Sequence, residues 1–514
     1  MDILFSSGSS KATVELPQET IKDIALTELI EQISGDSSDR KILNKIMTTI
    51  PCESTDIIFR QNIVKDLFEN KVLCENLGTI LEQIKVLKDF GGFRKVEIDN
   101  DYSLYSLLQK FRELSIYVKT IEDLYNELAN NKISSQGLVA LREYLKAFVN
   151  DEKFITAKKD IEVMHEHLSN VRGALVGVNF TPDLNIESVS SVEFLPTRIR
   201  SKYTLADIAV GAKLSTALHF QRIDDPLLVG LAPKLEKHLK NHYREIRKIL
   251  AEYVEYDNEF LTEMCEGLTF YLKSAEFGQK LAARGYELTF PQITPDSKDR
   301  LSLTDFYNIR LAFTDEKNIV KNDFCFAEKE KLFILTGPNR GGKTILEQAL
   351  GLISVMMSLG LFVPAKKCVG LPFKNILTHF PIDENLTINY GRLGEEAIRI
   401  KEIVKACDKD TLVLFNETFS TTSSSDALYL SMDLLHILKD KGSSVIFNTH
   451  IHELVDKIPE MNKWNGDGNV SSIVMEIKDN INTFKLKKGS PDTGSYAYNI
   501  ALKYGITYEQ MKSE

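Results

Sequence analysis

A glycine-rich segment at residues 331–345, KLFILTGPNRGGKTI, carries residue types that could bind a nucleoside triphosphate. It fits the pattern GxxxxGK[ST], in which glycines let backbone N–H groups turn inward around a phosphate. Lys343 is predicted to contact the β- and γ-phosphates of ATP, and Thr344 to offer its hydroxyl to Mg²⁺. An apolar run before the segment and a helical pattern after it favour this prediction over a chance glycine-rich turn. The predicted phosphate-binding residues are Gly337, Pro338, Asn339, Arg340, Gly341, Gly342, Lys343 and Thr344.

Two apolar runs further along the chain end in polar residues that could complete the chemistry. LVLFNE, 412–417, ends in Asn416 and Glu417, and SSVIFNTH, 443–450, ends in His450. Glu417 is predicted to orient or deprotonate the attacking water, and His450 to sense the γ-phosphate from the end of a strand. Asn416 stands where such a strand would deliver an acid to magnesium. Its amide can accept hydrogen bonds from metal-bound water but brings no negative charge, so weaker retention of Mg²⁺ is predicted.

The elements that must position these residues follow from the apolar patterns. Strand-like runs alternate with helices after about residue 286, which predicts an α/β sheet covered by helices. Before it, two long helical runs flank a segment rich in β-branched residues, 173–195. The predicted domains are a helical core at 1–110, long helices at 111–285 with an insert at about 173–204, and a P-loop domain at 286–514. The pattern leaves open whether the long helices form two arms with a tip or a plain bundle with a decorated loop.

Composition limits the class of protein and its partners. The net charge of −10 gives no global basic footprint, so a nucleic-acid partner would need a local basic patch such as Arg198, Arg200 and Lys202. Six scattered cysteines without a CxxC pair, and no cationic, apolar start, predict a reduced cytoplasmic protein. The charge-free stretch 349–365 falls short of the ~20 residues that cross a bilayer. It is predicted to be a helix buried against a sheet, with no membrane contact.

The motifs together resemble those of MutS-type DNA mismatch-repair ATPases. TGPNRGGKT is similar to that family's TGPNMGGKS, LVLFNETFSTTSSSDALYLS to its LVLxDExGRGTSTxDGxxLA, and NTHIHEL to its ATHYHEL. The order and spacing agree over about 290–514, whereas residues 1–285 resemble the family's helical core, lever and clamp more loosely. The resemblance implies an α + α/β multidomain fold: a helical core and long lever helices with a small β-containing clamp, followed by an ABC-type P-loop ATPase domain.

The resemblance also implies cofactors, partners and further site residues. It implies ATP and Mg²⁺, and a homodimer in which a segment of one subunit closes the nucleotide site of the other. That segment corresponds to NYGRLGEEAIRI, 389–400, and its residues here are Gly391, Arg392, Gly394 and Glu396. Ile319 falls near the family's adenine-stacking Phe. DNA contacts would go to the backbone through Arg198, Arg200 and Lys202, and downstream repair proteins are possible partners. No segment resembles the family's mismatch-reading and connector domains, so none is expected.

Departures from the family motifs shape the functional hypotheses. Asn416 replaces an acid, Leu393 and Gly394 replace a Ser-Thr pair, and Phe419-Ser420-Thr421 replaces Gly-Arg-Gly. The first hypothesis is a dimeric, ATP-dependent DNA clamp that hydrolyses ATP slowly and acts in DNA repair or recombination without its own mismatch reader. The second is a nucleotide-switched protein-interaction module that binds ATP with little or no hydrolysis. A chromosome-clamp protein of the SMC type fits less well, because its arms would be far longer heptad runs.

Overall fold

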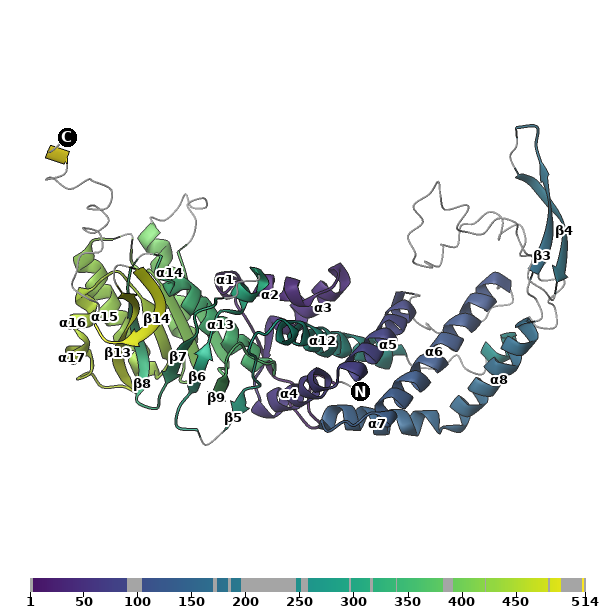
Figure 1. Ribbon diagram of the computed structural model, residues 1–514, viewed down its shortest axis with the longest axis horizontal. Helices are drawn as coiled ribbons and strands as arrows, with labels where there is room; N and C mark the ends of the chain where they lie inside the picture. The colour runs from purple at the N-terminus through teal and green to yellow at the C-terminus, as the bar shows by residue number, and fades with distance from the viewer. Residues whose placement is uncertain are drawn as a thin grey trace. The chain divides into compact units, whose positions relative to one another are not determined.

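The chain forms two compact units in the computed structural model (Figure 1). One unit contains residues 75–132 and 139–265, and the other contains residues 2–74, 133–138 and 266–514. The structure describes residues 3–89, 104–169, 173–183, 186–195, 246–250, 258–294, 297–314, 318–338, 340–381, 392–420, 422–478, 481–490 and 511–512.

Long helices make up most of the described residues of the unit that contains residues 75–132 and 139–265. They are α5 (Lys71–Asp89), which begins in the other unit, α6 (Leu104–Asn130), α7 (Gln136–Val149) and α8 (Glu152–Ser169). Along α6, Phe111, Leu114, Val118 and Ile121 are buried at the three- and four-residue spacing that places side chains on one helix face. Lys158 of α8 pairs with Glu122 of α6 at 2.6 Å.

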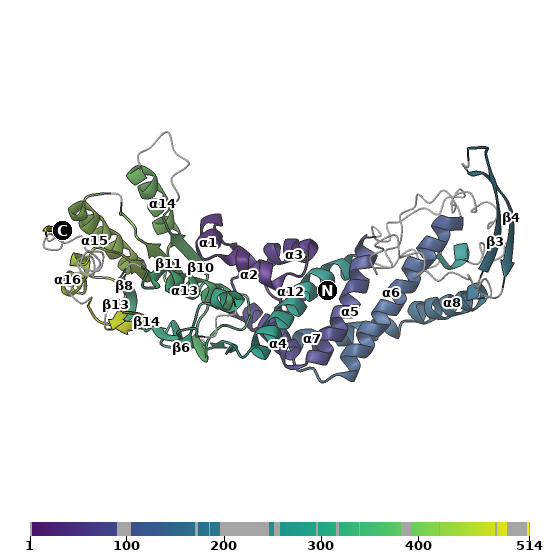
Figure 2. The same ribbon diagram turned by 45° about the horizontal axis from the view of Figure 1, so that its top comes forward.

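A two-stranded antiparallel ribbon follows α8 in this unit (Figures 1 and 2). Strand β3 (Gly173–Phe180) pairs with β4 (Ile186–Leu195) from Gly173↔Leu195 to Phe180↔Ile186, and the register shifts twice along the pair. The β-branched residues of this segment favour strands, and Pro182 lies in the turn between them. The predicted β segment within a helical region is therefore confirmed, whereas its continuation to residue 204 lies outside the described residues.

Short helices and strands begin the second unit. They are β1 (Thr13–Glu15), α1 (Gln18–Asp23), α2 (Leu26–Ile33), α3 (Ser37–Met47), β2 (Thr49–Pro51) and α4 (Ser54–Glu69), to which α12 (Asn258–Ala283) contributes residues 266–283. Asp36 caps α3 by accepting hydrogen bonds from the backbone N–H groups of Ser38 and Asp39 at 2.8 Å. The sequence predicted only helices here, and the pair β1–β2 was not predicted.

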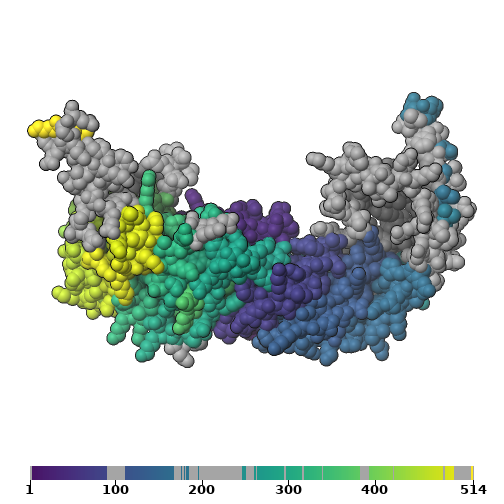
Figure 3. All heavy atoms as spheres, viewed as in Figure 1, coloured from purple at the N-terminus to yellow at the C-terminus, as the bar shows by residue number. Residues whose placement is uncertain are grey.

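A six-stranded sheet forms the centre of the second unit. Its order is β10 (Asn375–His379), β11 (Thr411–Asn416), β12 (Ser444–Asn448), β8 (Glu330–Thr336), β13 (Asn469–Lys478) and β14 (Ile481–Lys488). All neighbours are parallel except β13 and β14. The central strands β11 and β12 are buried throughout, which explains their unbroken apolar sequences. The edge strand β14 is largely exposed and reaches the surface of this unit (Figure 3).

Helices cover both faces of this sheet, as the sequence predicted. On one face α14 (Arg392–Ala406) and α15 (Ser424–Lys441) share a core with Val413, Phe415 and Phe447. On the other face α13 (Lys343–Ser358) packs against β11, where the Gly351 backbone lies close to Leu414. Two short helices, α16 (Glu453–Asp456) and α17 (Ile458–Met461), follow β12.

The charge-free stretch 349–365 begins inside α13 and is buried throughout. The predicted buried helix is confirmed as far as Ser358, after which the stretch continues as irregular chain. Among the residues that the structure describes, no helix is long and apolar enough to cross a membrane.

A smaller four-stranded sheet completes the second unit. Its order is β5 (Gln292–Ile293), β9 (Lys367–Gly370), β6 (Leu301–Phe306) and β7 (Asn322–Phe326), and a 3-10 helix, η1 (Ile309–Thr314), follows β6. Phe324 and Phe326 of β7 pack against Phe333 of β8 with ring centroids 5.0 and 5.6 Å apart. These contacts join the smaller sheet to the strand that leads into the glycine-rich loop.

Candidate nucleotide-binding site

The glycine-rich loop joins β8 to α13 in a conformation that requires glycine. Gly337 has φ +138° and Gly342 has φ +91°, where a side chain would strain the backbone. At Gly341 a Cβ atom would lie 2.9 Å from the Pro338 carbonyl oxygen. The loop therefore keeps an open backbone surface directly before the N-terminus of a 16-residue helix, where N–H groups and the helix dipole favour an anion.

Lys343 lies across the mouth of this loop. Its Nζ donates hydrogen bonds to the carbonyl oxygens of Gly337 at 3.0 Å and Pro338 at 3.2 Å. Burial lowers the pKa of Lys343, while the charges of Glu417 and Glu347 oppose that shift. A buried ammonium whose hydrogen bonds go to neutral carbonyl groups is suited to exchange them for phosphate oxygens.

Glu417 and His450 meet at the carboxyl ends of neighbouring parallel strands. β11 ends at Asn416 opposite Asn448 of β12, and the two side chains just beyond these residues approach each other. Glu417 Oε1 lies 2.8 Å from His450 Nε2. Both side chains keep contact with solvent, with exposed fractions of 38% and 41%. A carboxylate placed in this way can accept a proton from water while the imidazole holds its orientation.

The turn after β11 is strained at two residues. Glu417 has φ +53° and Phe419 has φ +64°, and left-handed backbone at non-glycine residues costs roughly 1–3 kcal/mol each. The hydrogen bonds that hold the turn include Glu417 N to Asn448 O at 2.9 Å and Phe419 N to Glu396 Oε1 at 2.8 Å. Strain of this kind is concentrated at functional sites.

A buried polar network lies beneath this turn, and the sequence analysis missed it. Asn448 Nδ2 donates to Asn416 Oδ1 at 2.6 Å and to Glu347 Oε2 of α13 at 3.0 Å. Burial raises the pKa of Glu347 well above its usual value, although the hydrogen bond from Asn448 and the charge of Lys343 oppose this. No signal in the sequence marked Glu347, because it is followed by Gln348 and resembles an exposed helical residue.

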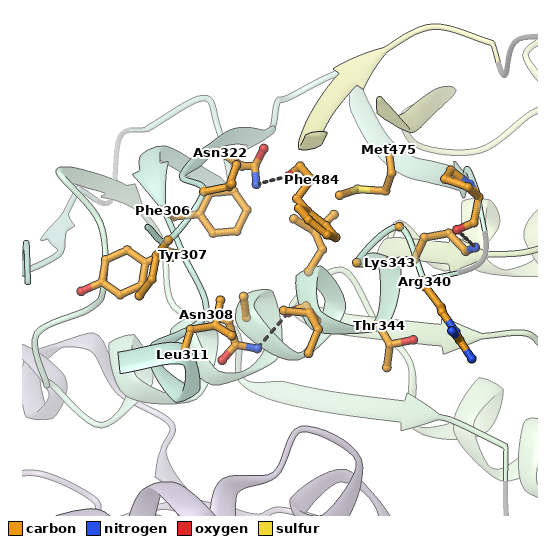
Figure 4. A pocket seen from close by; sticks show the side chains of 18 of the residues that line it. Phe306, Tyr307, Asn308, Leu311, Asn322, Arg340, Lys343, Thr344, Met475 and Phe484 are labelled. Carbon is orange, nitrogen blue, oxygen red and sulfur yellow. Dashed lines mark hydrogen bonds between the residues drawn. The ribbon is translucent and has the colours of Figure 1, made fainter. Parts of the chain in front are cut away.

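A cavity of roughly 500 Å³ opens beside the loop (Figure 4). Its volume is within the range of small-molecule sites, roughly 300–1,000 Å³. Ile319 lines it, together with Phe306 and Phe484. Phe484, from β14, lies between the Phe306 and Asn322 side of the cavity and the loop residues, and its carbonyl oxygen accepts a hydrogen bond from Asn322 at 3.1 Å. Phe484 was not among the site residues that the sequence predicted.

Most of the predicted nucleotide-site residues lie around this cavity or directly beside it. Those that line it are Ile319, Pro338, Arg340, Gly341, Gly342, Lys343, Thr344 and Glu417. Asn416 is 7% exposed in the network, and Gly394 and Glu396 lie near the start of α14. Arg392 is the first residue of that helix. Asn339, Gly391, Arg198, Arg200 and Lys202 lie outside the described residues.

The donor groups fit a magnesium ion carried by a nucleotide. In the ranges that the structure describes, no group of three or more His, Cys, Asp or Glu side chains could hold a metal. Mg²⁺ in phosphate sites needs no such cage, because phosphates, water and one or two protein oxygens surround it. The Thr344 hydroxyl and the Asn416 amide are such oxygen donors, and both belong to this site.

Two parts of the chain match models of known protein families. The family model described as MutS domain V matches residues 333–510, and the model described as MutS2 N-terminal domain matches residues 53–284. This chain belongs to the MutS family. The resemblance noted in the sequence is therefore confirmed at the level of the family.

Curated relatives cover this MutS-family chain to different extents. It is 24% identical over 469 residues to the DNA mismatch repair protein MutS of Petrotoga mobilis, a match that covers 85% of this chain and 55% of that protein. It is 29% identical over 294 residues to the endonuclease MutS2 of Staphylococcus carnosus, covering 55% of this chain and 35% of that protein. An endonuclease MutS2 of Staphylococcus aureus is 32% identical over 195 residues, covering 38% of this chain and 26% of that protein. The chain thus matches about half or less of the length of these relatives.

Proposed function

We propose that this MutS-family chain binds ATP with Mg²⁺ and hydrolyses it slowly as a homodimeric clamp on DNA. The observation that carries the proposal is the Glu417–His450 pair, 2.8 Å apart, beside a glycine-rich loop and a cavity of nucleotide size. A water-activating carboxylate, a strand-terminal histidine and a phosphate loop form a set that serves phosphoryl transfer. Relatives named MutS and MutS2 support a role in DNA repair or recombination.

Each residue of the site has a role in this scheme. Backbone N–H groups of residues 337–344 and Lys343 bind the phosphates, and Thr344 and Asn416 hold the magnesium ion, the latter through water. Bound magnesium supplies positive charge that stabilises the transferring phosphoryl group. Glu417 orients the attacking water and accepts its proton, while His450 positions Glu417. Phe484 and Ile319 pack against the adenine base.

Slow turnover follows from the departures around the γ-phosphate. Asn416 brings no negative charge to the metal site, which weakens retention of magnesium. Gly391, Arg392, Gly394 and Glu396 form the segment that closes over the nucleotide of the partner subunit in the proposed dimer. Because Leu393 and Gly394 stand where the family has Ser-Thr, these two positions offer no side-chain hydroxyl to the phosphate.

DNA binding is proposed for the unit with long helices. In this scheme residues 1–110 form a helical core, the helices of 111–285 act as levers, and residues 173–204 form the clamp, with 286–514 as the ATPase domain. Arg198, Arg200 and Lys202 of the clamp segment would contact phosphates, so binding would depend on salt and little on sequence. Gel shifts of duplex, mismatched and branched DNA, with and without ATP, test this part. Unchanged duplex binding at low salt after all three residues are changed to Ala contradicts it.

A nucleotide-switched interaction module is the second candidate. The neutral Asn416, engaged by Asn448 in a buried network, favours it, because a site that holds magnesium weakly can bind ATP with little hydrolysis. In that case ATP would open and close the long helices on a protein partner.

Steady-state phosphate release separates the two candidates. Wild type is compared with Glu417→Ala and with Glu328→Gln, a change at an exposed turn residue of the same unit. Hydrolysis by the proposed site predicts a loss of roughly 10²–10⁴-fold in Glu417→Ala only. Equal phosphate release from wild type and Glu417→Ala would leave the interaction module as the better description.

A further inference from the structure

The network of Glu347, Asn448 and Asn416 is a closed polar cluster between α13 and the sheet. Glu347 and Asn448 have no exposed surface, and Asn416 is 7% exposed. The register of β11 and β12 sets Asn416 opposite Asn448, and the amide of Asn448 bridges Asn416 and Glu347 through hydrogen bonds of 2.6 and 3.0 Å. One glutamate, one helical turn after the phosphate-loop lysine, is thereby connected to the position expected to serve magnesium.

Fold stability does not account for this arrangement. Burying a carboxyl group is costly unless it is paired and fully hydrogen-bonded, and an apolar residue of similar volume is often as stable or more so. Within the described part of the chain, Glu347 Oε1 and Asn448 Oδ1 have no hydrogen-bond partner. The neighbouring helix positions Leu346, Ala349 and Leu350 are apolar and buried, so an apolar residue would suit the packing at 347.

The position of the cluster indicates what the carboxyl group serves. The acid that a phosphate-loop site would place at 416 is an amide here, and a buried carboxyl lies one amide further away. Lys343 acts electrostatically on Glu347, which ties the carboxyl to the phosphate end of the cavity. We propose that Glu347 supplies the buried carboxyl group of the magnesium-bearing end of this site in place of an acid at 416, acting through Asn448 as a positioning residue for Asn416. This inference rests on the proposed nucleotide-binding function.

Hydrogen-bond chemistry explains how the positioning works. Glu347 Oε2 accepts a hydrogen bond from Asn448 Nδ2, so the amide nitrogen of Asn448 faces Glu347. The second hydrogen on that nitrogen then points to Asn416, which must turn its oxygen towards Asn448. Glu347 in this way sets the orientation of two amides. It also places one carboxyl group near the cation-binding end of the site without adding an acid at 416.

If Glu347 has this role, the site needs one carboxyl group, which can stand at position 347 or at position 416. The variants are Asn416→Asp, Glu347→Gln, the double variant, and Glu328→Gln as an exposed control. Thermal unfolding without nucleotide is one readout. The other is the Mg²⁺-dependent gain in affinity for a fluorescent ATP analogue, measured with Mg²⁺ and with EDTA.

The expected pattern is compensation between the two positions. Asn416→Asp places two carboxyl groups on one buried amide and lowers the unfolding temperature by about 2–4 °C. Glu347→Gln reduces the Mg²⁺-dependent gain in affinity by about tenfold, as loss of a residue that orients a metal ligand does. The double variant restores both readouts to within about twofold in affinity and about 1 °C of wild type.

Two results would overturn the inference in different ways. If the wild type binds the Mg²⁺-loaded analogue but the effects of the two substitutions are additive, the role of Glu347 is rejected and the proposed nucleotide site stands. Failure of the wild type to bind the analogue under any condition would reject the proposed nucleotide site, and with it the role of Glu347.

Discussion

His379, at the end of β10, gives a pH dependence that can be worked out from the structure. Its ring is 5% exposed, and its Nδ1 lies 3.1 Å from Thr418 Oγ1 in the strained turn. Burial, helped by the positive charge of Arg399, lowers the pKa of His379 from 6.5 to about 4. The neutral imidazole is therefore the form that the folded protein holds against this turn.

The direction of the effect follows from this lowered pKa. As the pH falls, the unfolded chain takes up the proton first, near pH 6.5, while folded His379 stays neutral until about pH 4. The stability contributed by the neutral ring is therefore complete above about pH 6.5 and is lost as the pH falls to 4. Between pH 7.5 and 5.0 the loss amounts to about 2 kcal/mol in the free energy of unfolding.

Urea unfolding of wild type and His379→Gln measures this loss. Trp464, the single tryptophan, lies in the same unit as His379 and reports its unfolding by fluorescence. From pH 7.5 to 5.0, wild type should lose about 2 kcal/mol more than the variant, whose side chain does not titrate. Glu396 Oε1 lies 3.9 Å from His379 Nε2 and could instead hold the imidazolium. Equal losses in the two proteins would show that it does so and would refute the reasoning.

Three further substitutions test other parts of the site and its support. Phe484→Ala should weaken ATP binding by about tenfold, because an aromatic–base stack contributes roughly 1–3 kcal/mol. In competition assays the same variant should bind tripolyphosphate as the wild type does. Equal losses for both ligands would place Phe484 at the phosphates. Lys343→Ala should abolish detectable ATP binding in calorimetry while the folded signal of Trp464 persists, and retained binding would argue against the phosphate-loop assignment. Gly351→Ala should lower the free energy of unfolding in urea by about 1–3 kcal/mol, because the new Cβ would lie 2.6 Å from Ile24 Cγ2. This loss should exceed the gain from the better helix propensity of Ala. A stabilised variant would show that Ile24 moves freely.

The sequence predicted the parts of the fold that local patterns determine. The strands β8, β11 and β12 are buried on both faces, so their apolar runs stand out from the surrounding chain. The glycine-rich loop was recognised from its GxxxxGK[ST] pattern between an apolar run and a helical pattern. In the structure, Gly337 and Gly342 occupy backbone conformations that other residues avoid. Local patterns of this kind do not need knowledge of distant contacts.

Other strands depend on contacts that the sequence does not display. β6, at Leu301–Phe306, follows a polar stretch with two prolines and pairs with the next strand, β7, and with β9, which is about 60 residues further along the chain. β14 is exposed at the sheet edge and carries alternating lysines, so it has no apolar run to mark it. The predicted boundaries at residues 110 and 285 stay predictions.

The site was predicted in its motifs and missed in its supporting residues. Glu417 and His450 end two apolar runs, and parallel strands bring such ends together. In the sequence, Glu347 resembles an ordinary exposed glutamate of a helix. Only the packing of α13 against β11 shows that it is buried. Phe484 reaches the cavity from an edge strand more than a hundred residues away from the loop in the chain.

Single-turnover hydrolysis of bound ATP tests the central claim most directly. Wild type and Glu417→Gln are each loaded with limiting radiolabelled ATP and Mg²⁺, and the conversion of bound ATP to ADP is followed by chemical quench. The account predicts that both proteins bind ATP with similar affinity, and that Glu417→Gln converts it roughly 10²–10⁴ times more slowly than wild type. Equal conversion rates in the two proteins, with ATP bound to both, would contradict it.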